Sequence, residues 1–217
     1  MSFRVVLFDL DGTVLNTLDD LADAVNASLA KHEMPARTRE EVRSFVGNGI
    51  RALIERAVPT GTDSALVARV LNEFKRYYGA HCADKTAPYA GVPELLSTLR
   101  AHGVRTAVVS NKADFAVQEL AKRYFADLFD LALGERAERP AKPAPDMVHH
   151  ALEALGATAA EAVYVGDSDV DVLTARNAQL PCIAVTWGFR DRACLKKAGA
   201  TVFADTAKEL LDLILAP

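Results

Sequence analysis

The sequence has few cysteines and no spacing that would pair them. It contains three in 217 residues, Cys82, Cys182 and Cys194, an odd number without a CxxC pair. A disulfide framework and a structural zinc site are therefore both disfavoured. We expect three reduced thiols, mostly buried.

The chain also lacks a long apolar run and any block of Lys or Arg residues. No segment approaches the ~20 apolar residues of a membrane span, and the N-terminus enters a short strand-like run without the basic and apolar regions of a signal peptide. Lys plus Arg total 25 against 29 for Asp plus Glu, a formal net charge of -4, so neither nucleic acid nor an anionic membrane is an expected partner. These absences predict a cytoplasmic protein and leave its oligomeric state open.

Short aliphatic runs that alternate with helical patterns make up most of the chain. Half of the residues are hydrophobic, which is enough for a sizeable core. Strand-like runs occupy residues 4–10, 104–110, 128–133, 162–166, 182–187 and 201–204, and most are separated by helical stretches such as "ADFAVQELAKRYF". The alternation indicates βαβ units, so we predict an α/β fold with a Rossmann-like parallel sheet.

One stretch breaks this alternation. From about residue 18 to about residue 81 the sequence is continuously helical, and Thr38 followed by Glu41 has the spacing of a capping box. This is too much helix for one crossover. We therefore predict an all-helical domain inserted at residues 16–87, an α/β core made of residues 1–15 and 88–217, and hinges at 15–18 and 85–88.

Polar side chains gather where the predicted strands end, which is where open parallel sheets bind ligands. The run "DLDGT" places Asp9 and Asp11 at the end of the first strand; a turn explains Asp11 before Gly12 but leaves Asp9 unexplained. Other strand ends and one loop supply Ser110, Asn111, Lys142, Asp167 and Asp171. Because clustered carboxylates repel one another, they need a cation, and Asp9, Asp167 and a backbone carbonyl of the turn offer the hard oxygen ligands that Mg²⁺ prefers.

Four motifs in this order, "DLDGT", "SNK", the Lys of "AKPAPD" and "GDSDVD", resemble the signature of the haloacid-dehalogenase superfamily in its phosphatase branch. The resemblance spans residues 5–171, and the helical insertion lies where this family carries a cap. It implies that Asp9 is a nucleophile that forms an aspartyl-phosphate, and that Asp11 is a general acid and then a base. The backbone carbonyl of Asp11 would bind Mg²⁺ together with the Asp9 and Asp167 carboxylates.

The resemblance also implies the groups that hold the phosphate. Ser110, the Asn111 amide and Lys142 would bind the phosphoryl oxygens, and Asp171 would orient Mg²⁺-bound waters or Lys142. Dehalogenases of the superfamily lack the acid at the position of Asp11, so a phosphatase is favoured. Asn16 stands where relatives often carry an acid; it is outside the chemistry, and we expect a changed hinge contact there.

The insertion resembles the cap of bacterial phosphoglycolate phosphatases through its "VGNG" turn and the helix that follows. Asn48 and Arg51, at the start of that helix, are candidates to bind a substrate carboxylate, and a solvent-facing Arg51 is the simpler alternative. The sequence thus predicts a Mg²⁺-dependent phosphomonoesterase that hydrolyses a small-molecule acid phosphate ester, 2-phosphoglycolate.

Other functions stay open. A phosphomutase of the β-phosphoglucomutase kind shares the core motifs, and phosphatases for sugar phosphates or pyrophosphate carry similar caps. A non-catalytic phospho-acceptor like response-regulator receivers is disfavoured, since it has no leaving alcohol for Asp11 to protonate and no cap to close.

Overall fold

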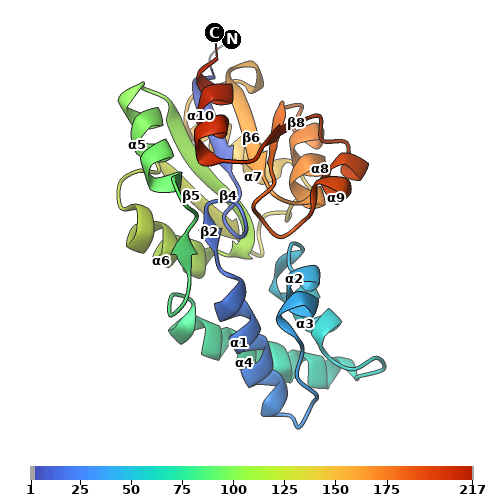
Figure 1. Cartoon of the computed structure of the whole chain (residues 1–217). Helices are drawn as coiled ribbons and strands as arrows, with labels where there is room; N and C mark the ends of the chain where they lie inside the picture. The colour runs from blue at the N-terminus through green and yellow to red at the C-terminus, as the bar shows by residue number, and fades with distance from the viewer. Residues whose placement is uncertain (1–2, 217) are drawn as a thin grey trace.

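A parallel sheet forms the centre of the computed structural model, which describes residues 3–216 (Figure 1). Within that range the sheet has six strands in the order β5-β4-β1-β6-β7-β8, and neighbouring strands pair in parallel. Their bounds are β1 (Val5–Phe8), β4 (Arg105–Ala113), β5 (Leu131–Glu135), β6 (Ala162–Gly166), β7 (Cys182–Val185) and β8 (Val202–Ala204). The α/β, Rossmann-like fold class is confirmed. Residues 1, 2 and 217 of the predicted core lie outside the described range.

Both faces of the sheet are covered, as its apolar strands require. In β1 every residue is buried and successive side chains point to opposite faces. Val6 and Phe8 belong to the hydrophobic cluster that includes helices α5 and α10, whereas Val5 and Leu7 pack with α7. The helices of the core are α5 (Val92–Ala101), α6 (Asp114–Phe125), α7 (Asp146–Ala154), α8 (Asp169–Asn177), α9 (Arg192–Ala198) and α10 (Ala207–Leu215), with a 3₁₀ turn at Ala159–Glu161.

The stretch between the first two strands of the sheet is helical, as the sequence predicts. Its helices are α1 (Leu18–Ala30), α2 (Arg39–Phe45), α3 (Gly49–Ala57) and α4 (Ser64–His81). They lie together at one end of the molecule, below the sheet in Figure 1, and are called the helical insertion from here on. The predicted capping box is present at the start of α2, where the Glu41 N–H donates to Thr38 Oγ1 and the Thr38 N–H donates to Glu41 Oε2.

The chain crosses between sheet and insertion twice, and the two crossings are paired. β2 (Leu15–Asn16) and β3 (Ala87–Pro88) form an antiparallel ribbon that the sequence did not reveal. At its side the Asp20 carboxylate accepts hydrogen bonds from the Lys85 and Thr86 N–H groups and from Thr86 Oγ1. The two predicted hinge segments are therefore held next to each other.

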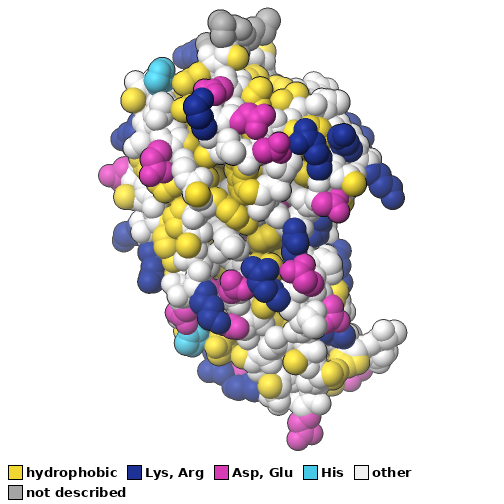
Figure 2. All heavy atoms as spheres, in the orientation of Figure 1, with side chains coloured by type: hydrophobic (Ala, Val, Ile, Leu, Met, Phe, Trp, Pro, Cys, Tyr) yellow, Lys and Arg dark blue, Asp and Glu magenta, His cyan; other side chains and the backbone are white. Residues whose placement is uncertain are grey.

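The surface mixes charges of both signs. On the face drawn in Figure 2, acidic and basic side chains are interspersed over core and insertion alike. Between residues 3 and 216, no helix has the length and apolar character needed to cross a membrane. The three cysteines are free; Cys82 is buried, whereas Cys182 and Cys194 are only partly buried.

Candidate active site

One cavity lies between the carboxyl ends of the strands and the helical insertion. The core contributes its polar lining: Asp9, Asp11, Ser110, Asn111, Lys142 and Asp167. The insertion contributes a mostly apolar wall that includes Leu21, Val46, Ile50 and Leu53. The structure thus brings every core residue that the motifs singled out to a single cavity, except Asp171, which lies behind it.

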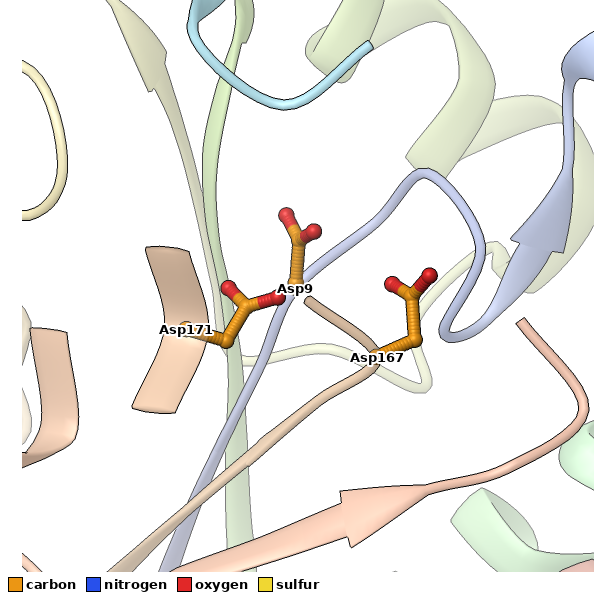
Figure 3. Close-up of side chains that lie close together, drawn as sticks. All are labelled: Asp9, Asp167 and Asp171. Carbon is orange, nitrogen blue, oxygen red and sulfur yellow. The ribbon is translucent and has the colours of Figure 1, made fainter. Parts of the chain in front are cut away.

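Three buried carboxylates, two of which line this cavity, lie close together (Figure 3). Asp9 follows β1, Asp167 follows β6 and Asp171 is in the first turn of α8, and each offers an oxygen within 4.8 Å of the others. Burial raises the pKa of Asp9 to about 6, and the charge of Asp171 adds to the rise. Burial and the same neighbour also raise the pKa of Asp167 well above its usual range. The charged forms of Asp9 and Asp167 are therefore disfavoured in this environment, and a cation bound between them would stabilise those charged forms.

Both oxygens of the Asp171 carboxylate are occupied by contacts with neighbouring protein groups. Its Oδ2 accepts from the Ser168 N–H and hydroxyl, and its Oδ1 lies 2.8 Å from Lys142 Nζ and accepts from the Tyr164 hydroxyl. The contacts leave this carboxylate little capacity to bind a metal. Its role in the structure is to hold Lys142.

Asp167 is fixed by close backbone neighbours. Its two oxygens accept hydrogen bonds from Thr13 Oγ1 at 2.9 Å and from the Phe189 N–H at 2.7 Å. A Cβ at Gly12, whose φ is +86°, would lie 2.3 Å from Asp167 Oδ2, and one at Gly188 would lie 2.3 Å from Asp167 Cβ. Only glycine fits at these two positions, and each carboxylate oxygen keeps a free lone pair.

The carboxylates fit a hard divalent cation. Among the described residues, none donates a hydrogen bond of ordinary geometry to the buried Asp9 Oδ1, although Lys142 Nζ lies 2.9 Å away. A buried carboxylate oxygen without a hydrogen-bond donor is uncommon in proteins and calls for an explanation. Asp9 Oδ1 and the Asp167 oxygens, which retain free lone pairs, are the kind of oxygen ligands that Mg²⁺ prefers. We therefore regard Asp9 and Asp167 as candidate metal ligands.

Lys142 is buried in the floor of the cavity, where Asn111 holds its backbone. The Lys142 N–H donates to Asn111 Oδ1 at 2.7 Å, and Asn111 Nδ2 donates to the Lys142 carbonyl at 2.9 Å. The same amide nitrogen also donates to the Gly47 carbonyl of the helical insertion at 3.0 Å. The Asn111 side chain thus connects the loop that carries Lys142, strand β4 and the helical insertion.

Asp11 has different neighbours from Asp9. Its Oδ1 accepts hydrogen bonds from Thr17 Oγ1 at 2.6 Å and from Lys112 Nζ at 2.9 Å. Lys112 is the functional candidate that sequence reasoning missed. Its signal in the sequence is the last position of the "SNK" motif, but the motif alone does not say what the lysine side chain contacts.

Two residues proposed for the substrate carboxylate lie away from the cavity. Arg51 is on the outer face of α3 with its side chain 68% exposed, 3.7 Å from Glu55. Asn48 is exposed, and its Oδ1 accepts a hydrogen bond from Arg56. Neither contributes to the lining, which instead includes Lys112 and Arg190. In this structure Arg51 therefore faces solvent, which is the simpler of the two expectations that the sequence gives for it.

Known proteins share this architecture. The sequence model of the family described as haloacid dehalogenase-like hydrolase matches residues 6–185. Phosphoglycolate phosphatase of Thiobacillus denitrificans is 34% identical over 195 residues, which are 87% of this chain and 86% of that protein. A solved structure from Lactobacillus delbrueckii subsp. bulgaricus, provisionally named phosphoglycolate phosphatase, covers 100% of both chains with a TM-score of 0.95 and 38% identity. CbbY from Rhodobacter sphaeroides, solved in complex with phosphate, covers 96% of both chains with a TM-score of 0.80 and 26% identity.

Proposed function

Because the chain belongs to the haloacid dehalogenase-like hydrolase family and is a phosphatase like its named relatives, we propose that it hydrolyses a small acid phosphate, 2-phosphoglycolate, with Mg²⁺ and through an aspartyl-phosphate. One observation carries the proposal. Asp9 and Asp11 line the same cavity but have separate partners, Lys142 for the first and Thr17 with Lys112 for the second. Two carboxyl groups with different environments at one site suit two different roles.

Asp9 would act as the nucleophile. One of its carboxylate oxygens forms a bond to phosphorus while the bond from phosphorus to the leaving oxygen breaks, and Asp11 gives that oxygen its proton. In the second step Asp11 takes a proton from water, the water oxygen bonds to phosphorus, and the Asp9 carboxylate is released with inorganic phosphate. Ser110, the backbone N–H of Asn111 and Lys142 would hold the transferred oxygens throughout.

The carboxylates of Asp9 and Asp167 and the backbone carbonyl of Asp11 would hold Mg²⁺. When bound, the ion would neutralise charge on the phosphoryl oxygens and on the two acids. Asp171 would act through Lys142, since its oxygens already contact that ammonium, Tyr164 and Ser168. Asp171 would therefore hold Lys142, which we propose binds the phosphate, while Asp9 and Asp167 would bind the metal.

Two observations support an acidic substrate. The relatives with about a third of their residues identical are named phosphoglycolate phosphatase. In addition, Arg190 brings positive charge to the cavity wall, which would attract an anion beyond the phosphate itself. A sugar-phosphate phosphatase is the second candidate, because a variant of CbbY was solved with xylulose-(1,5)bisphosphate and covers 96% of this chain.

Phosphate release from a substrate panel tests this function. With Mg²⁺ present, 2-phosphoglycolate should give a higher kcat/KM than xylulose 1,5-bisphosphate, glucose 6-phosphate or pyrophosphate, and EDTA should abolish release. Asp9→Asn is the inactive control. A preference for the bisphosphate would replace the substrate assignment, and stimulation by glucose 1,6-bisphosphate with little phosphate released would indicate a phosphomutase.

A further inference from the structure

Lys112 is a buried lysine to which the reaction described above gives no role. It lies in β4 directly after Ser110 and Asn111, and its side chain is 2% exposed. The ammonium contacts both Asp11 oxygens, at 2.9 and 3.2 Å, and the Tyr78 hydroxyl at 2.6 Å. A buried ammonium is tolerated only when it is paired and hydrogen-bonded, so these contacts keep Lys112 inside the protein.

Tyr78 holds Lys112 from the side of the helical insertion. It is buried on α4, and its ring stacks on Phe74 with centroids 5.3 Å apart. Lys112 Nζ lies 4.6 Å from the centroid of the Tyr78 ring, a distance at which a cation is attracted to an aromatic face. The ammonium is therefore fixed between a rigid ring and the Asp11 carboxylate.

The two oxygens of Asp11 are held unequally. Oδ1 accepts two short hydrogen bonds, from Thr17 and Lys112, whereas the contact of Oδ2 among the described residues is the longer one to Lys112. A carboxyl group that transfers a proton needs an oxygen within hydrogen-bond reach of the reacting atom. Hydrogen bonds that fix its other oxygen set the direction in which the free oxygen points. In Asp11 the anchored oxygen is Oδ1, which leaves Oδ2 for the proton.

We propose that Lys112, held by Tyr78, is a positioning residue that orients the Asp11 carboxyl so that Oδ2 faces the leaving oxygen. The inference rests on the proposed function, in which Asp11 gives that oxygen its proton. Lys112 then acts through Asp11 and needs no contact with the substrate. A lysine that bound the substrate carboxylate instead would change the KM of acidic substrates alone.

The test compares leaving groups and substrate charge in Lys112→Met and Tyr78→Phe. With Mg²⁺, Lys112→Met should lower kcat by the same factor, about 10- to 100-fold, for 2-phosphoglycolate and for 2-hydroxyethyl phosphate, which has no carboxylate, and KM should change less than about threefold. The first turnover of p-nitrophenyl phosphate should stay within about threefold of wild type, because nitrophenolate leaves without a proton. Tyr78→Phe should show the same pattern with a smaller loss, about three- to tenfold.

Two variants on the same helix serve as controls. Tyr77→Phe removes a hydroxyl one residue away, and Lys75→Met removes an exposed lysine; both should leave all three rates unchanged. Circular dichroism checks the fold, and if Lys112→Met is unfolded, Tyr78→Phe decides the question.

Two results would overturn the inference while the proposed function stands. One is a KM increase confined to 2-phosphoglycolate. The other is an equal loss in the first turnover of p-nitrophenyl phosphate. Unchanged rates in both variants would have the same meaning. A wild-type protein that hydrolyses neither alkyl phosphate would instead overturn the proposed function, and this inference with it.

Discussion

At the scale of single residues, the active site depends on which buried charges have partners. Lys142 lies within 3 Å of oxygens from both Asp9 and Asp171, and Asp171 also accepts hydrogen bonds from Ser168 and Tyr164. Among the described residues, no donor of ordinary hydrogen-bond geometry reaches the buried Asp9 Oδ1. Of the three clustered acids, Asp9 therefore has the oxygen that is least engaged by the protein, which suits the nucleophilic role that we propose for it.

The pH dependence of stability should reveal the buried Asp9. Its pKa is raised from 3.8 to about 6, so the folded, metal-free protein binds the proton more tightly than the unfolded chain does. The free energy of unfolding should then fall as pH rises from about 4 to about 6. Asp9→Asn lacks this titration, so its unfolding free energy should increase relative to that of wild type across the window, by up to about 3 kcal/mol.

Chemical denaturation in EDTA at several pH values checks this expectation. The quantity to follow is the difference in unfolding free energy between Asp9→Asn and wild type. A difference that is constant with pH, or that changes in the opposite direction, would contradict a raised pKa at Asp9.

The sequence predicts the core residues of the site because local motifs place them. Asp9 and Asp11 follow an apolar strand, and Asp167 precedes a capped helix, so their approximate positions follow from the fold class alone. Arg51 and Lys112 could not be assigned in this way. Whether a side chain on α3 or at the end of β4 faces the cavity depends on how the helical insertion packs on the core. A local sequence pattern does not predict that packing.

At the scale of elements, the ribbon of β2 and β3 joins the sheet to the insertion. The buried Asp20 carboxylate ties the start of α1 to the returning segment through the N–H groups of Lys85 and Thr86. Asn16, the position at which we expect a changed hinge contact, uses its side-chain oxygen locally and accepts a hydrogen bond from the Leu18 N–H at 3.4 Å. The hinge contact is therefore local to the start of α1.

Asp20 and Asp23 form a matched pair for a stability measurement. Both contact Lys85, but Asp20 accepts buried backbone hydrogen bonds, whereas Asp23 pairs with the exposed ammonium at 2.6 Å. Asp20→Ala should lower the free energy of unfolding by about 2–4 kcal/mol, because buried N–H groups lose their acceptor. Asp23→Ala should cost less than about 1 kcal/mol. Urea denaturation measures both, and equal losses would show that the Asp20 contacts do not fasten the ribbon.

Elements with strong periodicity are predictable, and short irregular ones are not. All six strands of the sheet and the capping box of α2 are visible in the sequence. β2 and β3 have two residues each, too few for any alternation of polar and apolar side chains. β4 runs past Ser110 to Ala113, and its pairing with β5 shifts in register between Val109 and Ala113, which no alternation pattern predicts.

At the scale of the whole molecule, reciprocal contacts hold the insertion on the core. Arg43 of α2 donates to the carbonyls of Gly188 and Phe189, and Arg190 of the core donates to the carbonyls of Arg43 and Val46. The Phe189 N–H in turn holds Asp167. Residues 188–190 thus contact the insertion and also orient Asp167, a candidate metal ligand. This arrangement fits a helical cap that closes over the substrate and excludes water.

The central claim is that Asp9 takes the phosphoryl group while Asp11 moves the proton, and mass spectrometry of Asp11→Asn tests it most directly. This variant keeps the proposed nucleophile and the candidate metal ligands. After mixing with Mg²⁺ and p-nitrophenyl phosphate it should carry one phosphoryl group on Asp9, which persists because its hydrolysis lacks a base. Asp9→Asn should carry none and should turn over no substrate. A phosphoryl group on another residue, or activity retained in Asp9→Asn, would contradict the assignment of the two acids.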